Sequence, residues 1–391
     1  MWRFYMSYFS ITNKKNLILS IISIAIIMGL NIVHGDTNGL NNTVNIDSDI
    51  RIRHIQGDEH ESPLFGHYVS NVPGVVTVIT SNGFYIQDPD PDRNLATSEG
   101  IFVYTADDPD VMEGDYVFAD GFVYEYKGDT YSLGTTQIIS KKYIAQYRDN
   151  ISVAPTVIGA EGRMPPSSII EDDAAGLIEK NNEFDIDSDG IDFYESLEGM
   201  LVRVDNAVAV APSSCQGSKG NYRCVVPILV DNGTNANLRT SRGGIILQHN
   251  DSNPERIFIS FLSDTEKKIN VGDRFPAPIF GAISYYDNNY RIDVNKTPDV
   301  IHNNLSIEVS KKATQTELVI ATFNVKNFLA NRAKNLANYI INNLNEPDII
   351  ALEEIADNEG TKESGVDASK NYNSIIKEIN NSGGHNYKFI N

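Results

Sequence analysis

The stretch LVIATFNVKNFLANRAKNLANYIINNLNEPDIIALEEI, residues 318–355, decides the fold class of the C-terminal part of the chain. Its beginning, Leu318–Val325, is a continuous apolar run that predicts a buried strand, and Ile349–Ile355 predicts a second one. Between the two runs, apolar residues recur at helical spacing and predict an amphipathic helix. A second amphipathic helix follows. The order strand–helix–strand–helix therefore predicts an α/β domain with adjacent strands.

Two β-rich blocks precede this segment. In the first, GVVTVITSNGFYIQD at residues 74–88 consists of two strand-like runs joined by an Asn-Gly turn, which predicts a hairpin. Short strand-like runs continue around it, so we expect a small barrel, an OB-fold-like domain, over residues 50–148. The second block, residues 197–302, predicts another β-rich domain. The expected fold class is thus a multidomain α+β protein, with two β-rich domains before the α/β segment.

The two β-rich blocks share a short pattern. Gly114–Asp115 precedes Gly121 in the first block, and Gly272–Asp273 precedes Gly281 in the second. The two intervals differ by about two residues, so the match is loose. The pattern indicates either a weak internal repeat of related architecture or two unrelated β-domains that both use Gly-Asp turns.

The remaining segments are expected to be linkers between these domains and an N-terminal export signal. An apolar run after two lysines predicts a secretory signal peptide over residues 1–35, with an uncleaved membrane anchor as the alternative. The other assignments are a linker over 36–49, a linker with a short helix and an acidic loop over 149–196, a linker over 303–316 and an incomplete α/β domain over 317–391. We therefore expect a secreted protein, extracellular or periplasmic, with no stable membrane association after cleavage.

The charge balance excludes one way of binding nucleic acid. The chain has 52 Asp and Glu residues against 32 Lys and Arg residues, a formal net charge of −20. Proteins that bind polyanions through bulk charge are usually basic, because neutralised phosphates release counterions. Any action on nucleic acid must therefore use local sites, with bound cations to offset the acidic side chains.

The chain has two cysteines, Cys215 and Cys224, nine positions apart. In an exported protein such a pair most simply closes a small loop as a disulfide bond. A zinc site is the weaker alternative, because a second pair of ligands does not lie nearby in the sequence.

Polar residues at the ends of the two C-terminal strands are the main candidates for chemistry. Asn324 ends the first strand, and Glu353 and Glu354 interrupt the second. Strand alternation sends those two carboxylates to opposite faces of the sheet. A carboxylate so deep in an apolar strand is costly unless it is paired or binds a metal. Two interpretations stay open: a Glu paired with Arg or Lys at the sheet edge, and a Glu that binds a cation.

Several phrases of the sequence resemble a known superfamily. ATFNVKNF at residues 321–328 and PDIIALEEI at 347–355 resemble the opening of the endonuclease/exonuclease/phosphatase superfamily, which has the DNase-I-like fold. FYESLEGMLVRVDNAVAV at 193–210, with the phrases at 74–105 and 241–257, resembles the accessory region of bacterial extracellular nucleases of the ExeM and NucH type. The resemblance implies the N-terminal part of a DNase-I-like α/β sandwich and metal-dependent hydrolysis of phosphodiester bonds in extracellular DNA or RNA.

The resemblance also assigns the site residues. The superfamily's first-strand Asn matches Asn324 and its metal-binding Glu matches Glu354, so both are expected to be catalytic and metal-binding residues. Glu354 would hold Mg²⁺ or another divalent cation, and Asn324 would position the cation or a phosphate oxygen. Asn327 would have a local structural role only, and Glu353 is not assigned as a ligand. Nucleic acid is the implied substrate.

The chain departs from the superfamily in its catalytic base. The superfamily activates water with a His that is supported by an Asp, well after the Glu. Here His385 is the one His that follows Glu354, and its sequence context indicates an exposed loop residue. We therefore expect the 391-residue chain to be inactive alone. Two alternatives stay open: a non-catalytic nucleic-acid-binding or vestigial fragment, and another phosphoesterase of the same superfamily.

An acidic motif suggests a second metal site. Asp185, Asp187 and Asp189 in DIDSDG mimic the start of a calcium-binding loop, although Ser196 stands where such a loop has its Glu. A solvated acidic turn is the alternative interpretation.

Four aromatic residues of the first β-rich block are candidates for stacking on bases. They are Phe84, Tyr85, Phe102 and Tyr104. OB-fold domains bind nucleic-acid strands with such side chains. Packing in the core of the barrel explains the same residues equally well, because residues two apart share a face.

Overall fold

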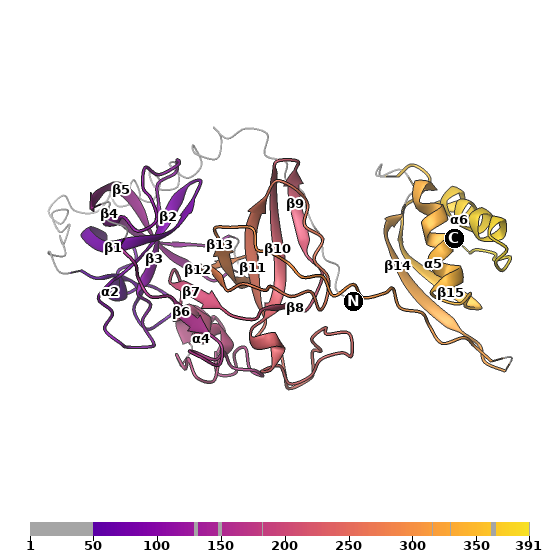
Figure 1. The fold of residues 1–391 in the computed structure, drawn as a ribbon, viewed down its shortest axis with the longest axis horizontal. Helices are drawn as coiled ribbons and strands as arrows, with labels where there is room; N and C mark the ends of the chain where they lie inside the picture. The colour runs from indigo at the N-terminus through magenta and orange to yellow at the C-terminus, as the bar shows by residue number, and fades with distance from the viewer. Residues whose placement is uncertain are drawn as a thin grey trace, which may run out of the picture. The chain divides into compact units, whose positions relative to one another are not determined.

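The structure is a computed structural model of the whole chain and describes residues 50–128, 132–147, 151–181, 183–314, 316–328, 330–360 and 365–390. The expected signal peptide and the linker over 36–49 lie outside these residues. The chain divides into two compact units, of which the first ends at Asn303 and the second begins at Asn304. Unit 1 contains a barrel and a larger sheet, and unit 2 contains two strands and two main helices (Figure 1).

The first domain of unit 1 is a closed barrel of five strands in the order β1-β2-β3-β5-β4. Its strands are β1 (Tyr68–Thr80), β2 (Gly83–Gln87), β3 (Gly100–Tyr104), β4 (Tyr116–Tyr126) and β5 (Thr135–Tyr147). The hairpin expected at residues 74–88 is β1 with β2, and Thr80 pairs with Gly83 across its turn. This strand order makes the barrel OB-fold-like, as expected. Alternate strand residues point inward and form one apolar core, with helix α2 (Ile52–Gln56) packed on it.

The second domain of unit 1 is a mixed sheet in the order β6-β7-β12-β13-β11-β10-β8, with β9 paired to β10. Its strands are β6 (Thr156–Ile158), β7 (Leu201–Val204), β8 (Val208–Ala209), β9 (Ser214–Ser218), β10 (Asn221–Leu229), β11 (Ile257–Ser263), β12 (Ile279–Tyr286) and β13 (Asn289–Val294). Three short helical segments accompany it, α3 (Ile178–Asn181), α4 (Gly190–Glu195) and the 3₁₀ turn η1 (Asp231–Gly233). One large apolar cluster is the core of this domain.

The segment 149–196, expected as a linker, is part of the second domain. Strand β6 pairs in parallel with β7, and Phe193 and Tyr194 of α4 lie in the domain core. The short helix expected in this segment is limited to α3. The reason is local: Glu171 accepts hydrogen bonds from the backbone N–H groups that follow it, and Gly176 has a φ of 114°, which ordinary helical residues do not adopt.

The barrel packs directly on the second sheet within unit 1. Val78 and Tyr85 of the barrel form a buried cluster with Ala282 of β12. The backbone N–H of Leu201 donates a hydrogen bond of 2.7 Å to the side chain of Gln87. The outer face of β1 and β2 is therefore an interface between domains.

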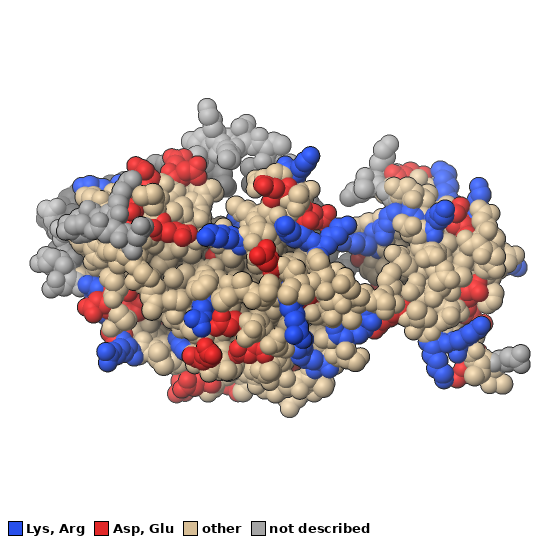
Figure 2. Space-filling model, in the orientation of Figure 1, with Lys and Arg blue, Asp and Glu red and all other residues tan. Residues whose placement is uncertain are grey.

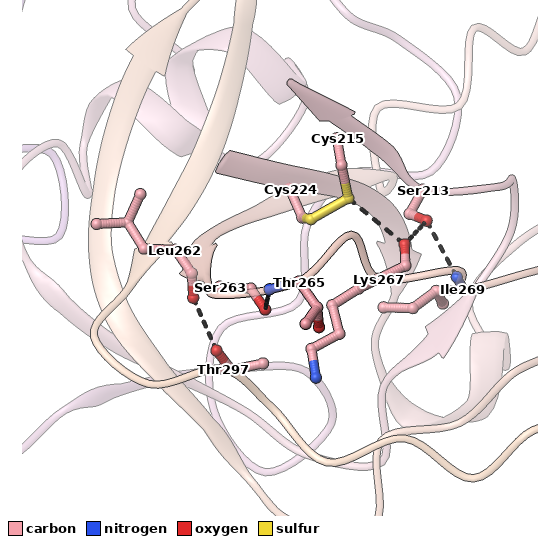
Figure 3. The surroundings of a disulfide bond; sticks show 9 residues. All are labelled: Ser213, Cys215, Cys224, Leu262, Ser263, Thr265, Lys267, Ile269 and Thr297. Carbon is pink, nitrogen blue, oxygen red and sulfur yellow. Dashed lines mark hydrogen bonds between the residues drawn. A yellow bond between two sulfur atoms is a disulfide. The ribbon is translucent and has the colours of Figure 1, made fainter. Parts of the chain in front are cut away.

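The expected disulfide bond is present. Cys215 of β9 and Cys224 of β10 lie opposite each other in the ladder and are joined, with an S–S distance of 2.02 Å. Figure 3 shows that Ser213 and Cys215 both face the backbone carbonyl of Lys267, to which the Ser213 hydroxyl donates at 2.6 Å. The disulfide bond joins the two strands of the β9–β10 hairpin, and the hydrogen bond of Ser213 links the start of this hairpin to the loop that contains Lys267.

Unit 2 consists of β14 (Ile320–Phe328), the 3₁₀ turn η2 (Ala330–Arg332), α5 (Ala333–Asn342), β15 (Ile349–Ile355) and α6 (Ser369–Asn381). The expected order strand–helix–strand–helix is therefore correct, and the two strands are adjacent and parallel. Both helices lie on the same side of the strands (Figure 1). The expected linker over 303–316 partly belongs to this unit, because Ser310 donates its backbone N–H to the carbonyl of Asn343.

Among the helices of the described ranges, none combines the length and the apolar character needed to cross a membrane. On the face of the molecule seen in Figure 2, acidic and basic side chains are interspersed over both units. The excess of acidic residues is thus spread over the visible surface and does not form one large patch.

Candidate functional site

The candidate residues of unit 2 lie where two parallel strands end. Asn324 of β14 is in register with Glu353 of β15, and Glu354 follows directly. Because the carboxyl ends of parallel strands meet at one edge of a sheet, the two chain segments bring their polar residues together there. The sequence prediction that Asn324 and Glu354 belong to one site is consistent with this placement.

Asn324 and Glu354 contact each other directly. The side-chain amide of Asn324 donates a hydrogen bond of 2.8 Å to Oε1 of Glu354. The backbone N–H of Asn327 donates to the other carboxylate oxygen, Oε2, at 3.2 Å. The Oδ1 atom of Asn324 accepts a hydrogen bond of 2.8 Å from the backbone N–H of Lys326. Each oxygen of the carboxylate therefore has one partner that fixes its orientation, and Asn327 has a positioning role.

The structure corrects two expectations about these carboxylates. Glu353 and Glu354 are exposed and not deeply buried. They also do not point to opposite faces, because Glu353 accepts a hydrogen bond from Thr322 and Glu354 accepts one from Asn324, and these two donors share a face of β14. The physical reason is that Glu354 has a φ of 56°, which breaks the alternation of an extended strand.

Exposure of the site follows from the one-sided packing of unit 2. The residues that face α5 and α6, among them Val325 and Leu336, form its core. The other face of the strands bears apolar residues that are largely exposed, Ile320 at 65 % and Ile349 at 51 %. The two carboxylates lie on this uncovered face, so neither requires a buried Arg or Lys partner.

The donor set fits a cation held by one carboxylate. Mg²⁺ prefers oxygen ligands and is commonly bound through one or two carboxylates together with water and substrate phosphate. Glu354 suits this role because its carboxylate is exposed and oriented by two donors. Asn324 turns its amide N–H group to Glu354 and its oxygen to Lys326, so it positions the carboxylate. Within the described residues of unit 2, no three His, Cys, Asp or Glu side chains converge on one point.

His385 is not placed to act on this site. Its side chain is 64 % exposed, and its backbone N–H donates to Glu346, which precedes the start of β15. Glu354 is close to the end of that strand. His385 therefore lies toward the opposite end of the sheet, and the expectation of an exposed loop residue agrees with the structure.

A second candidate surface lies on the barrel. The outward residues of β4 form an aromatic row, in which Phe122 is 44 % exposed, Tyr124 41 % and Tyr126 46 %. Tyr68 of β1 contacts Phe122 with ring centroids 5.1 Å apart, and Phe65 lies 6.2 Å from Tyr124. Exposed, neighbouring rings of this kind can stack on unpaired bases.

The aromatic residues expected to stack on bases are different ones. Phe84 is fully buried in the barrel core, and Tyr85 is buried against the second sheet. Phe102 packs on the same interdomain cluster as Tyr85, and Tyr104 is half-buried. Tyr85 and Phe102 lie on the face through which the barrel docks, and Phe84 lies in the core, so these three rings are covered by other parts of unit 1. The missed signal was the alternation in YVFADGFVYEY, which places an aromatic residue at nearly every outward position of β4.

A groove lies at the start of the aromatic row. It has a volume of about 420 Å³, and its lining includes Arg51, Arg53, His54, Tyr116 and Phe118. The guanidinium groups are held in place by acids, since Arg51 and Arg53 both pair with the buried carboxylate of Asp88. The groove thus combines aromatic rings with cationic side chains, which is the combination that binds phosphate and base together.

Comparisons with known proteins cover mainly unit 1. Residues 157–303 match a family described as a domain of unknown function, DUF8508, and this range contains the second sheet. None of the curated proteins matches the chain. Among solved structures, the chain is similar to a deletion mutant of the single-stranded DNA binding protein from Thermus aquaticus, with 8 % identity over 63 % of this chain and 95 % of that chain. Its TM-score is 0.17.

Proposed function

We propose that the chain acts on nucleic acid as part of a phosphodiesterase that depends on a divalent cation, with Glu354 as the ligand and Asn324 as its positioning residue. The observation that carries the proposal is the 2.8 Å hydrogen bond between the two side chains at the common edge of parallel strands. Because Glu354 is exposed, a substrate phosphate can approach it. Mg²⁺ fits this single, oriented carboxylate.

The residues of the site have distinct tasks in this proposal. A bound cation would supply stabilisation of the negative charge that develops on a phosphate oxygen. Asn324 and the backbone of Asn327 hold the two oxygens of Glu354, which keeps the ligand in one orientation. The attacking water also needs a proton acceptor, and His385 is at the other end of the sheet. The base must therefore come from another segment.

The fold of unit 2 supports the same proposal. A DNase-I-like domain is an α/β sandwich, and unit 2 supplies one layer of helices on one face of two parallel strands. The apolar residues on the opposite face, such as Ile320 and Ile349, are what a second layer would cover. Secretion is part of the proposal, and the Cys215–Cys224 disulfide supports it because such bonds persist in oxidising compartments.

A second candidate function is binding of single-stranded nucleic acid without cleavage. The observation that favours it is the exposed aromatic row of β4, which continues into the groove lined by Arg51 and Arg53. The two functions are compatible, since they use residues of different units of the chain. They are separable, because the first depends on Glu354 and the second on Phe122 and Tyr124.

The first test is cleavage of supercoiled plasmid by the purified chain with Mg²⁺. We expect no cleavage, because the described residues of unit 2 place no His beside Glu354. Cleavage that persists in the Glu354→Ala variant would contradict both the role of Glu354 and the need for an additional base.

The second test uses a longer protein that joins this chain to a segment carrying a His–Asp pair. There we expect Mg²⁺-dependent nicking that Glu354→Ala reduces to background. Asn324→Ala should lower it about 10–100-fold, the usual effect of losing a residue that orients a metal ligand. Glu353→Ala is the matched control, since Glu353 is an adjacent, exposed acid that bonds only to Thr322 among the described contacts. Equal loss in both Glu variants would refute the assignment.

A further inference from the structure

A group of carboxylates in the second domain lies outside both candidate surfaces. One oxygen each from Glu171, Asp189 and Asp192 lies within 4.8 Å of the other two. The residues come from two segments, and the backbone joins them: Gly190 donates its N–H to the carbonyl of Ile169 at 3.0 Å. This link brings Glu171 beside the start of α4, although 18 positions separate Glu171 from Asp189 (189 − 171).

Several oxygens of this group are buried and have no hydrogen-bond partner. Asp189 and Asp192 are fully buried, at 0 % exposure. Oε2 of Glu171, Oδ1 of Asp185 and Oδ1 of Asp189 are each shielded from solvent without a partner. The second oxygen of Glu171 accepts from two backbone N–H groups, and that of Asp189 accepts from Asp172 at 3.2 Å. The carboxylates are thus anchored on one side and unsatisfied on the other.

The charges around the group are unbalanced. Asp189 is buried, and Asp185 and Glu171 are its acidic neighbours. Among the described residues, a basic side chain pairs with Asp192, whose Oδ1 lies 2.6 Å from Nε2 of buried His60. The Nδ1 atom of the same ring lies 3.2 Å from Oε2 of Glu195. The His60 ring therefore faces Asp192 and Glu195, while the unsatisfied oxygens of Glu171, Asp185 and Asp189 lie among acidic side chains.

We propose that Glu171, Asp189 and Asp192 bind a calcium ion, with Asp185 at the edge of the same site. Ca²⁺ takes six to eight oxygen ligands in a flexible arrangement, and carboxylates from loops suit it better than they suit the smaller, octahedral Mg²⁺. The ion would satisfy the buried oxygens and offset the acids that now face one another.

This ligand set differs from the one that the sequence motif suggested. Asp189 is common to both, but Asp187 is exposed and is not one of the three converging carboxylates. A calcium-binding loop takes its ligands from one continuous segment. In the proposed site the other two ligands are Glu171 and Asp192, and Glu171 comes from a separate segment. The motif and the proposed site share this turn but differ in their ligands, because Glu171 is brought here by the hydrogen bonds of Gly190 and Ile191 to residues 169–170.

The test measures calcium binding and thermal stability of the full chain after chelation. We expect about one Ca²⁺ per chain by calorimetric titration. At a concentration about 100 times the dissociation constant, Ca²⁺ should raise the Tm by roughly 5 °C over that in EDTA, and Mg²⁺ should raise it less. Glu354→Ala should bind Ca²⁺ as the wild type does, which separates this site from the one in unit 2.

Two variants and a matched control locate the ion. Asp189→Asn and Glu171→Gln should each lose the rise in Tm that Ca²⁺ causes, and Asp189→Asn should not be less stable than the wild type in EDTA, because it removes a charge that faces other acids. Asp187→Asn, an exposed residue of the same turn, should keep the full rise.

Three outcomes would overturn the proposal. The first is that the wild type shows no Tm change with Ca²⁺ at millimolar concentration. The second is that Asp187→Asn removes the effect as completely as Asp189→Asn does. The third is that Asp189→Asn and Glu171→Gln, folded as shown by their far-ultraviolet circular dichroism, both retain the full calcium response.

Discussion

Strand β4 of the barrel and strand β12 of the second sheet both follow a Gly-Asp turn, but their outward faces differ in exposure. Strand β4 starts directly after Gly114–Asp115, and β12 starts at Ile279, a few residues after Gly272–Asp273. In the first, Oδ2 of Asp115 accepts the backbone N–H of Met112 at 2.9 Å, and in the second, Oδ2 of Asp273 accepts that of Asn270 at the same distance. The pattern noted in the sequence thus corresponds to a shared local structure, although the two strands belong to sheets of different topology.

The glycine within each strand also has the same surroundings. A Cβ at Gly121 would lie 2.3 Å from the carbonyl oxygen of Ile139 on the neighbouring strand, and one at Gly281 would lie 2.3 Å from that of Asp293. In both places the strand approaches its partner so closely that a side chain cannot fit.

The outward faces of the two strands differ. The residues after Gly121 include exposed Phe122 and Tyr124, whereas those after Gly281 include Ala282 and Ser284, both buried. Ala282 and Ser284 are small because the barrel packs on β12. Equal backbone geometry therefore does not imply equal function: the face that is free of a neighbouring domain is the one that can bind a ligand.

The largest expected effect is on stability, and it tests the close approach to a neighbouring strand that Gly121 and Gly281 share. Gly121→Val and Gly281→Val should each destabilise unit 1 by more than about 3 kcal/mol, because the new side chain meets a backbone carbonyl that cannot move without breaking the ladder. Urea unfolding followed by circular dichroism measures this. If one of the two variants kept wild-type stability, the two strands would not share this packing.

The next largest expected effect is the loss of stability when a large side chain is introduced on the buried face of β12. Ala282→Phe introduces at β12 the residue that β4 carries at Phe122, and overpacking of the fully buried site should cost about 1–3 kcal/mol. The reverse change, Phe122→Ala, removes a half-exposed ring and should cost less than Ala282→Phe. Thermal unfolding of both variants gives the comparison. A tolerated Phe at 282 would mean that the barrel does not pack on β12.

The exposed face of β4 is tested by binding. Phe122→Ala and Tyr124→Ala should each weaken binding of single-stranded DNA by about 1 kcal/mol, the lower end of the values for base stacking and roughly a fivefold rise in Kd. Fluorescence anisotropy with a labelled oligonucleotide measures the Kd. Phe280→Ala is the control, since Phe280 is a comparably exposed ring, at 46 %, on β12. An equal loss in the control would contradict a binding surface on β4.

The smallest expected effect is on the pH dependence of the Tm, and it distinguishes the aspartates of the two Gly-Asp turns. Burial opposes ionisation of Asp273, but the backbone N–H groups of Asn270 and Asn303 and the ring of His302 prevail and lower its pKa below the ordinary value. A carboxylate of this kind stabilises the fold above the unfolded-state pKa, about 3.9, and loses that contribution as the pH falls through the folded-state pKa. Asp273→Asn should therefore lower the Tm at pH 6 and converge with the wild type below about pH 4.

Asp115→Asn is the control for this measurement. The side chain of Asp115 accepts the turn hydrogen bond from Met112, whereas that of Asp273 also accepts hydrogen bonds from Asn303 and the His302 ring. The loss of Tm at pH 6 should therefore be smaller for Asp115→Asn. A difference between wild type and Asp273→Asn that stays constant from pH 6 to pH 3 would contradict the expectation.

The elements of unit 2 could be predicted because they depend on local pattern. The predicted strand at 349–355 coincides with β15, and the helical spacing from Ala333 onward corresponds to α5. The pairing of Asn324 with Glu354 followed from the resemblance. Their exposure did not follow, because it depends on which face of the strands is covered and on the positive φ of Glu354.

The exposure of the aromatic residues of the barrel could not be predicted from the sequence pattern. Tyr85 and Phe102 stand next to residues that point to the opposite face of their strands, as Phe122 and Tyr124 do. The sequence alone therefore does not show which of the two pairs is exposed. The choice depends on the docking of the second sheet, which buries Tyr85, partly covers Phe102 and leaves Phe122 and Tyr124 exposed.

The sequence by itself determined the strands, the helices, the disulfide between Cys215 and Cys224 and the Gly-Asp turns, because each depends on residues close together along the chain. Only the tertiary structure decided which aromatic face is free, that Glu354 is exposed and that Glu171 lies beside Asp189. These properties depend on which distant segments meet, and a local pattern of alternation or spacing is the same whichever neighbour covers it.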